Sequence, residues 1–376
     1  MFCLLLYPEM DRAFSLMNRY GFTLQFEVCM FSSKWSGTVL DDCSCKKVKP
    51  RVSIYCLAFN HEQYIERAIN SFLMQEVNFD FEIIVHDDAS TDSTQAILRD
   101  YQARYPTKIK LVLQNENQYS KGVPIVKEYI EPLIEGDYIA MCEGDDYWTD
   151  NRKLQKQFDA LEKHHECCLC VHKVMEVTNE GDNLNTFFPR FHLETGPIDR
   201  STFIPLNKEY AFQTSSYFIR ADVWHDYIKY PPEFKQLCPV GDVPMLLFFG
   251  NLGPVYYFDD MMSCYRRGTT SSMSDWLFRQ GSLDRLSVHA ETMVRVFEAF
   301  DAYTRGAYGT FCQEQAAGYM AQVYFCGNGS ISSLLNNDWQ NLQNLRWEKK
   351  VAVILSAIFP YLAKTLYLNR LSKNGK

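Results

Sequence analysis

Apolar runs alternate with amphipathic segments along residues 51–141, and this pattern predicts repeated strand and helix units. RVSIYCLAF, residues 51–59, is almost continuously apolar and β-rich, as expected of a strand buried on both faces. It leads into HEQYIERAINSFLMQ, residues 61–75, whose apolar positions recur at helical spacing. The alternation returns in FEIIVHDD, KIKLVLQ and DYIAMCE, with helices between them, one of them near residues 123–134. Such units predict βαβ connections and a mixed, mostly parallel sheet flanked by helices.

Strand signals become sparse after residue 151. DNRKLQKQFDALEKH predicts a helix capped by Asp150, TSSYFIR and PVYYFDDMMSCYRR predict two further strands, and residues 282–325 predict two helices. The chain has no self-similar period of about 20 to 50 residues, which argues against a solenoid. We therefore expect a main α/β domain over residues 49–270 and a helical C-terminal region over residues 271–376.

The two ends of the chain differ from this pattern. Residues 1–48 open with an apolar run that lacks a preceding basic region and a small-residue cleavage site, so an irregular extension is favoured over a signal peptide. A natural start at Met10, Met17 or Met30 is one alternative for this extension. Near the other end, VAVILSAIFPYLAKTLYL contains Pro360 and a lysine, and it is shorter than the roughly 20 apolar residues of a spanning helix. Packing on the protein's own domain is favoured there, and peripheral membrane contact through residues 350–368 is the alternative, because the flanks are basic.

Composition narrows the class of partner. The 376 residues are 47% hydrophobic and 15% aromatic, enough to bury a large core. The formal net charge is −8 and no block of Lys and Arg is long enough to follow a phosphate backbone, which argues against nucleic acid as the main partner. None of the 13 cysteines has zinc-site spacing, so we interpret them as reduced thiols of a cytoplasmic protein.

Acidic residues gather at the carboxyl ends of predicted strands. In an open α/β sheet, ligands bind beyond the carboxyl ends of the strands, where these loops converge. Carboxylates that lie close together repel one another unless a cation is present, and oxygen ligands favour Mg²⁺ or Mn²⁺ with a substrate diphosphate completing the coordination. The three acidic groups are Asp87 and Asp88; Glu143, Asp145 and Asp146; and Asp242.

Four ordered segments resemble the family 2 glycosyltransferases, inverting enzymes of the GT-A fold. They are VSIYCLAFNHEQYIERAINSFLMQ, FEIIVHDDASTDST, GDYIAMCEGDDYW and GDVPMLLFFGNLGPVYYFDDMMSCYRR, and together they cover about residues 50–270. The resemblance implies a GT-A, Rossmann-like α/β fold with a C-terminal helical extension, and a hexosyltransferase type of activity.

The resemblance also implies roles for the nucleotide-binding residues. Phe59, followed by Asn60, stands where family members stack an aromatic ring on the base, and Asp87 or Asp88 stands where an Asp accepts a hydrogen bond from the base. Taken alone, the two aspartates could be a strand end and a helix N-cap, and Phe59 could be a core residue.

The segment EGDD matches the family's metal motif. Glu143 and Asp145 would face ribose and metal, with Asp146 as the alternative metal ligand. Asp242 stands in the place of the catalytic base. The sequence departs from the family pattern at two positions: Glu143 replaces the usual first Asp of the metal motif, and Gly241 replaces the usual Glu before the base.

Three further residues are candidates for ligand contacts. Arg266 and Arg267, in a loop rich in Gly and Ser, could bind the diphosphate through their guanidinium groups. Trp148 could form a platform for the acceptor sugar, with core packing as an equal alternative. For the arginines, a solvated surface position is the alternative.

These observations predict a metal-assisted transfer of a sugar from a nucleotide-sugar donor, expected to be UDP-linked. The acceptor would be a hydroxyl of a glycan or lipid-linked saccharide in cell-surface polysaccharide synthesis, at the cytoplasmic side of the membrane. A non-catalytic sugar-nucleotide-binding protein is a second hypothesis, raised by Glu143 and Gly241. A sugar-nucleotide pyrophosphorylase is less well supported, because AFNHEQY has neither the Gly nor the Arg expected after the first strand.

Overall fold

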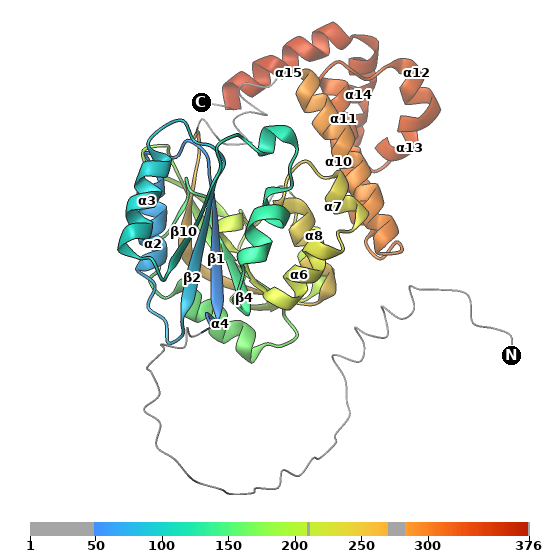
Figure 1. Cartoon of the computed structure of the whole chain (residues 1–376). Helices are drawn as coiled ribbons and strands as arrows, with labels where there is room; N and C mark the ends of the chain where they lie inside the picture. Colours follow the sequence, from blue (N-terminus) through green and yellow to red (C-terminus); the bar gives the residue numbers. More distant parts are fainter. Residues whose placement is uncertain (1–48, 209–210, 270–282, 375–376) are drawn as a thin grey trace, which may run out of the picture. The chain divides into compact units, whose positions relative to one another are not determined.

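The computed structural model describes residues 49–208, 211–269 and 283–374. The predicted extension over residues 1–48 and the first part of the predicted C-terminal region, residues 271–282, lie outside these ranges. Within them, ten strands form one mixed sheet in the order β3-β2-β1-β4-β9-β6-β10-β5, with β7 paired to β6 and β8 to β10. Strands β2, β1 and β4 of this sheet lie side by side (Figure 1). The strands are β1 (Val52–Ala58), β2 (Phe81–Asp87), β3 (Ile109–Leu113), β4 (Tyr138–Met141), β5 (Tyr147–Trp148), β6 (Leu169–Val177), β7 (Asn183–Phe188), β8 (Gly196–Ile198), β9 (Phe218–Arg220) and β10 (Val255–Arg266).

Helices accompany the sheet and continue beyond it. The helix expected near residues 123–134 is a pair of short turns, Val126–Ile130 and Glu131–Leu133, the second with a proline in its first turn. The regular helices are α2 (Ile65–Leu73), α3 (Thr94–Arg104), α4 (Lys153–Lys163), α5 (Arg200–Leu206), α6 (Ala221–Lys229), α7 (Glu233–Leu237), α8 (Asp242–Leu252), α10 (Leu283–Tyr303), α11 (Gly309–Phe325), α12 (Ile331–Ser333), α13 (Trp339–Leu342), α14 (Trp347–Ile358) and α15 (Pro360–Asn374).

The strands β3, β2, β1 and β4 form a parallel half of the sheet. In the register, Ala58 of β1 lies opposite Asp87 of β2, and Tyr55 lies opposite Met141 of β4. All residues of β2 and β4 are buried, as expected for parallel strands covered on both faces. Because the strands are parallel, the loops that follow β1, β2 and β4 leave from the same edge of the sheet.

The other half of the sheet mixes directions. β9 runs antiparallel between β4 and β6, whereas β6 and β10 are parallel. The two-residue strand β5 pairs antiparallel with the end of β10, so that Tyr147 lies opposite Cys264. This pairing brings the segment after β4 next to the end of β10. The mixed α/β architecture with C-terminal helices confirms the predicted fold class.

Hydrophobic clusters fill both faces of the sheet. On one face, α2 buries Ile65, Ala68, Ile69 and Phe72, the positions that the helical spacing predicted. The other face is covered by residues of α5, α6 and α8, and α10 joins the same cluster. Phe300 of α10 packs edge-on against Phe234 of α7, with ring centroids 5.2 Å apart.

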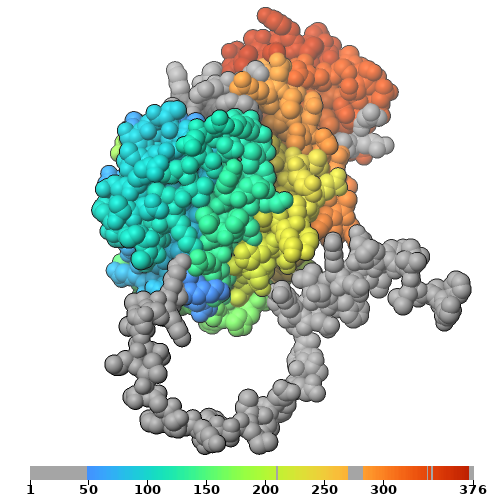
Figure 2. Space-filling model, in the orientation of Figure 1, coloured from blue at the N-terminus to red at the C-terminus, as the bar shows by residue number. Residues whose placement is uncertain are grey.

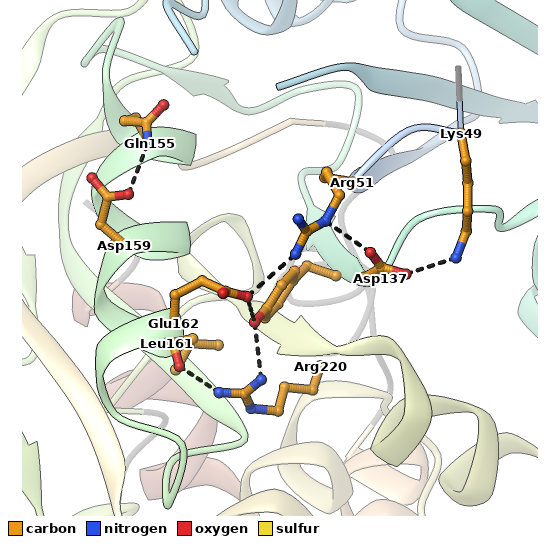
Figure 3. A network of polar contacts seen from close by, with 9 residues as sticks. Lys49, Arg51, Asp137, Gln155, Asp159, Leu161, Glu162 and Arg220 are labelled. Carbon is orange, nitrogen blue, oxygen red and sulfur yellow. Dashed lines mark hydrogen bonds and ion pairs between the residues drawn. The ribbon is translucent and has the colours of Figure 1, made fainter. Parts of the chain in front are cut away.

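A polar network ties together the amino-terminal ends of β1 and β4 (Figure 3). The Arg220 guanidinium donates to the Cys167 carbonyl and, at 2.9 Å, to the Tyr138 hydroxyl. The same hydroxyl donates to Glu162 of α4 at 2.6 Å, and Glu162 also pairs with Arg51. These groups bind one another through hydrogen bonds and ion pairs, so we assign them a structural role. They lie at the end of the sheet opposite to the loops described below.

The apolar C-terminal segment is divided at Pro360. Helix α14 ends at Ile358 and α15 begins at Pro360, as expected because proline lacks the amide hydrogen that would continue the helix. Val353 and Ala357 of α14 pack against Ala321 and Tyr324 of α11. Among the described residues, none of the helices has the length and apolar character needed to cross a membrane.

Candidate active site

The loop between β4 and β5, which we call the acidic loop, carries three of the predicted carboxylates: Glu143, Asp145 and Asp146. It is held on the end of β1 because the Gly144 amide donates to the Leu57 carbonyl at 2.9 Å. Within the loop, the Asp146 amide donates to the Glu143 carbonyl at 3.1 Å. Gly144 itself is closely enclosed. A Cβ at this position would lie 2.7 Å from Nδ1 of His61 and 3.2 Å from the Leu57 carbonyl oxygen, so the loop can approach β1 this closely only with glycine.

Asp145 and Asp146 are buried and each has one oxygen atom bound by the end of β10 or the residues after it. Oδ2 of Asp145 accepts a hydrogen bond from the Thr269 hydroxyl at 2.8 Å and lies 4.0 Å from Nε2 of His61. Oδ1 of Asp146 accepts from the Arg266 amide at 2.8 Å. Oδ2 of Asp146 is buried and has no hydrogen-bond partner within the described ranges. A buried carboxylate oxygen left without a donor is costly, which makes this atom a candidate ligand for a cation.

The electrostatics of this loop favour protonation when no cation is present. Burial raises the pKa of Asp146 well above its usual range, the charges of Asp145 and Glu143 add to the increase, and Arg266 opposes it. The protein atoms crowded around Glu143, together with the charges of Asp145 and Asp242, raise its pKa to about 8. The Glu143 side chain still reaches solvent, so it stands at the open side of the carboxylate group.

Asp242 is the first residue of α8 and belongs to the same group of charges. It is half-buried, and its Oδ1 accepts from the Val243 amide at 2.8 Å. Burial raises the pKa of Asp242. Its charge contributes to the raised pKa values of Glu143 and of the buried Tyr217. The structure therefore brings Asp242 close to the acidic loop, although about 100 residues separate them in the sequence.

The loops after β1 and β2 are held to one another. Asn60 adopts a left-handed backbone conformation (φ 54°), its amide donates to Ser90, and its Oδ1 accepts from the Thr91 amide at 2.8 Å. Phe59, beside it, is half-buried. The side chain of Asn60 thus stabilises the neighbouring loop, and the nucleotide-binding roles of Phe59 and Asn60 remain predictions.

Asp87 and Asp88 are buried at the end of β2 and fix adjacent turns. Asp87 accepts from the Ser90 amide at 2.9 Å and from the Gln95 side chain at 2.7 Å. Asp88 accepts from the amides of Gln118 and Tyr119. Among the described residues, no hydrogen bond or ion pair joins either aspartate to the acidic loop. Asp87 is the last residue of β2, but neither aspartate caps α3, whose N-cap is Ser93. Contact of either aspartate with a base remains a prediction.

The candidates Arg266 and Trp148 have structural contacts. The buried Arg266 guanidinium donates to the Asp145 carbonyl at 2.9 Å and to the Asn179 carbonyl at 2.6 Å, and it lies over the Tyr64 ring. Trp148 is 1% exposed and its indole donates to the Ser215 carbonyl. The guanidinium and the indole are both buried against protein atoms in this arrangement, so neither side chain is proposed as a ligand contact below.

Arg267 is half-exposed and its side chain is already paired. Its Nε lies 2.8 Å from one oxygen of the buried Glu176, and Arg190 lies 2.7 Å from the other oxygen. A diphosphate would have to compete with this buried carboxylate for the guanidinium. We therefore leave Arg267 out of the proposed site as well.

Two residues near the acidic loop were not identified from the sequence. No metal-like spacing includes His61, and Thr269 belongs to no recognisable motif. The structure buries both and places them against Oδ2 of Asp145. Neither contact can be read from spacing, because 84 and 124 residues separate the partners in the chain.

The donor set suits a hard divalent cation. Oδ2 of Asp146 lacks a hydrogen-bond partner, and the neighbouring groups are carboxylates, the ligands that Mg²⁺ and Mn²⁺ prefer. In the described part of the chain, no group of three or more His, Cys, Asp or Glu side chains is arranged to hold a metal ion. Mg²⁺ commonly uses one or two carboxylates together with water and substrate phosphate, so these residues fit such an ion.

Fold and site together define an α/β domain with a carboxylate-lined ligand site at the carboxyl edge of its parallel strands. Residues 53–223 match the profile of glycosyl transferase family 2, and this region of the chain belongs to that family.

Two relatives are similar to this chain in sequence, and one solved structure is similar to it in fold. The chain is 39% identical over 138 residues to the uncharacterized protein Rv1520 of Mycobacterium tuberculosis, covering 37% of this chain and 39% of that protein. It is 30% identical over 139 residues to the putative teichuronic acid biosynthesis glycosyltransferase TuaG of Bacillus subtilis, covering 37% of this chain and 52% of the relative. The fold is similar to that of S. aureus TarS 1–349 in complex with UDP-GlcNAc, with a TM-score of 0.50, 16% identity, and coverage of 78% of this chain and 89% of that one. The matches thus span about half or less of the length of these two relatives.

Proposed function

We propose that this protein is an inverting glycosyltransferase. It moves a sugar from a nucleotide-sugar donor to a hydroxyl group of a glycan or lipid-linked acceptor in polysaccharide biosynthesis. The observation that carries the proposal is the shared electrostatic environment of Glu143, Asp145, Asp146 and Asp242 at the carboxyl edge of a family 2 domain.

Asp145 and Asp146 would hold the divalent cation, Mg²⁺ or Mn²⁺, with Glu143 on the solvent side of them. When bound, such an ion supplies Lewis-acid stabilisation of the negative charge that grows on the departing diphosphate. The protein's own contribution is orientation: Thr269 and the Arg266 amide each hold one carboxylate oxygen in place. Because one oxygen of each carboxylate is held by the protein, the fold orients the other oxygen of each carboxylate before a ligand binds.

Asp242 is the proposed general base. As the acceptor oxygen bonds to the anomeric carbon, the bond from that carbon to the diphosphate oxygen breaks, and the hydroxyl proton passes to the Asp242 carboxylate. Burial raises the pKa of Asp242, which makes its carboxylate a stronger base than an exposed aspartate. Direct attack from the face opposite the leaving group inverts the anomeric centre and needs no second nucleophile.

The donor and the cellular location follow from supporting observations. The similar fold of TarS holds UDP-GlcNAc, and on that likeness we propose a UDP-sugar as donor. The cysteines in the described ranges are all free thiols, eight of the nine buried, which suits a reducing compartment and the cytoplasmic side of the membrane.

The test is a panel of nucleotide-sugar donors with the purified full chain and Mn²⁺, scored by release of nucleoside diphosphate. We expect release from at least one donor, loss of release in EDTA, and loss in the variant Asp145→Asn. Asp226→Asn, on the exposed side of α6, is the matched control and should behave as wild type. Release that continues unchanged in EDTA would remove the metal from the proposal.

The non-catalytic alternative makes a different prediction for the same panel. It predicts that a nucleotide-sugar binds with a measurable dissociation constant while wild type and Asp242→Asn release nucleoside diphosphate equally slowly from every donor. That result would replace the transferase proposal by a binding protein.

A further inference from the structure

The C-terminal helices expose an unusual amount of apolar surface. Helix α14 buries Val353 and Ala357 against α11, yet a second apolar stripe faces solvent. This stripe is formed by positions i, i+4, i+8 and i+11 of one helix face: Trp347 (71% exposed), Val351 (46%), Leu355 (51%) and Ile358 (46%). A helix that is apolar on two faces needs a second partner.

The exposed apolar surface continues across Pro360 into α15. The inner side of α15 packs Tyr367 and Leu371 against Leu283, Leu286 and Cys326. The outward residues of this helix and of its junction with α14 are Phe359, Tyr361, Leu362, Leu366 and Leu368, each between 47% and 85% exposed. We call the exposed apolar residues of α14, the junction and α15 the C-terminal apolar surface. Figure 2 shows the C-terminal part of the chain, in red, at the top of the view.

Basic side chains accompany this surface. Residues 346–371 contain five basic residues and one acidic residue, a net charge of +4 in a chain whose formal net charge is −8. The basic residues are Arg346, Lys349, Lys350, Lys364 and Arg370. Among the described residues, Lys364 is the only one of these five that forms an ion pair, with Nζ 3.9 Å from Asp284. The charge of the segment is therefore opposite to that of the rest of the protein.

We propose that the C-terminal apolar surface docks on an anionic lipid surface, with α14 and α15 lying in the interface. Apolar side chains flanked by Lys and Arg are the combination that binds anionic bilayers, and Trp347 and Tyr361 have the amphipathic rings that favour the headgroup level. Neither helix crosses the membrane, since both are too short. The inference does not depend on the proposed catalytic function.

Electrostatics favour lipid over a second copy of the chain. A two-fold interface through this surface would bring two segments of net charge +4 together, and like charges across an interface are unfavourable. Anionic headgroups instead attract every one of the basic residues, each contributing on the order of 1 kcal/mol near a bilayer.

The first test is co-sedimentation of the full chain with phosphatidylcholine vesicles and with vesicles that also contain phosphatidylglycerol. We expect binding to the anionic vesicles and a decrease on the order of tenfold or more in the double variant Leu355→Gln/Ile358→Gln, because two partly exposed apolar side chains lose their contact with lipid. The matched control is Val288→Gln/Leu252→Gln, which changes two apolar residues of comparable exposure on α10 and α8. The control should bind as wild type.

A second variant isolates the charge. Arg346→Gln/Lys349→Gln should bind anionic vesicles several-fold more weakly, and the control Arg99→Gln/Lys163→Gln, with two exposed basic residues elsewhere, should not. Unchanged thermal unfolding of each variant excludes loss of folding as the cause. The proposal is overturned if wild type binds neither kind of vesicle, if the apolar variant binds as well as wild type, or if the wild type self-associates in solution and the apolar variant does not.

Discussion

Asp242 combines the two properties that the proposed base needs. It is half-buried, which raises its pKa, and it is close enough to Glu143 for the two charges to interact. Its hydrogen bond to the Val243 amide fixes one carboxylate oxygen at the start of α8. The other oxygen is the one that a substrate hydroxyl would approach.

Replacement of Asp242 by Asn should lower kcat by about 10² to 10⁴, the usual contribution of a general base, with little change in donor affinity. Asp222→Asn is a closely matched control. Asp222 also lies in the first turn of its helix and accepts from the amide of the next residue at 2.8 Å, but outside the carboxylate site. Steady-state kinetics on both variants test this, and an equal decrease in the two would show that the effect comes from the helix start and not from catalysis.

The sequence identified the carboxylates of this site but not the residues that position them. Glu143, Asp145 and Asp146 stand out because they follow an apolar strand. Asp242 was assigned through the resemblance to the family 2 glycosyltransferases, and it begins α8 instead of following a strand as predicted. Thr269 could not be found in this way, because a threonine in a loop becomes informative only when strand pairing places it beside Asp145.

The acidic loop is an element fixed from both sides. Gly144 lies against β1, and the following strand β5 pairs with the end of β10. The position of the carboxylates therefore depends on backbone contacts between three segments that are distant in sequence: β1, the loop that continues into β5, and β10. This makes the loop rigid before any ligand binds, which lowers the cost of binding.

Gly144→Ala should destabilise the fold by about 1 to 3 kcal/mol, because the added methyl group would meet the His61 ring and the Leu57 carbonyl. Gly318→Ala is the control: this exposed helical glycine of α11 has open space around it, and alanine should stabilise the protein by up to about 1 kcal/mol. Urea unfolding measures both. Equal stability of Gly144→Ala and wild type would mean that the loop can move away from β1 without cost.

The strands that were predicted well are those with uninterrupted apolar runs. β1, β2 and β4 are buried on both faces, and their sequences show this directly. β6 was missed because His172 and Lys173 interrupt its apolar pattern, although both belong to the strand. β7 is largely exposed and polar, and β5 is only two residues long. Their pairing depends on contacts across the sheet that no local pattern records.

At the scale of the whole molecule, the carboxylate site should lower the free energy of unfolding as the pH rises when no cation is bound. The pKa values of Glu143, Asp146 and Asp242 are all raised in the folded protein. Between about pH 5 and pH 8, the folded state therefore holds more protons at these groups than the unfolded state does. Stability falls with increasing pH wherever the folded state binds more protons.

We expect the contribution of these three carboxyl groups to the free energy of unfolding to decrease from pH 5.5 to pH 8. Urea unfolding with EDTA present measures this as a decrease in the total free energy of unfolding that depends on the three groups. Glu143→Gln should reduce the decrease, because its pKa of about 8 lies at the upper end of this interval. Glu128→Gln, an exposed residue away from the site, should leave the slope unchanged. Identical slopes for wild type and both variants would contradict the raised pKa of Glu143.

The hydrogen bond between Asp146 and position 266 has a consequence for how far this chain can diverge. The donor is the main-chain amide, not the guanidinium, and every amino acid except proline carries that group. Homologues and laboratory variants can therefore exchange the arginine and still keep this aspartate in place, whereas the packing over Tyr64 and the contact with the Asp145 carbonyl would be lost.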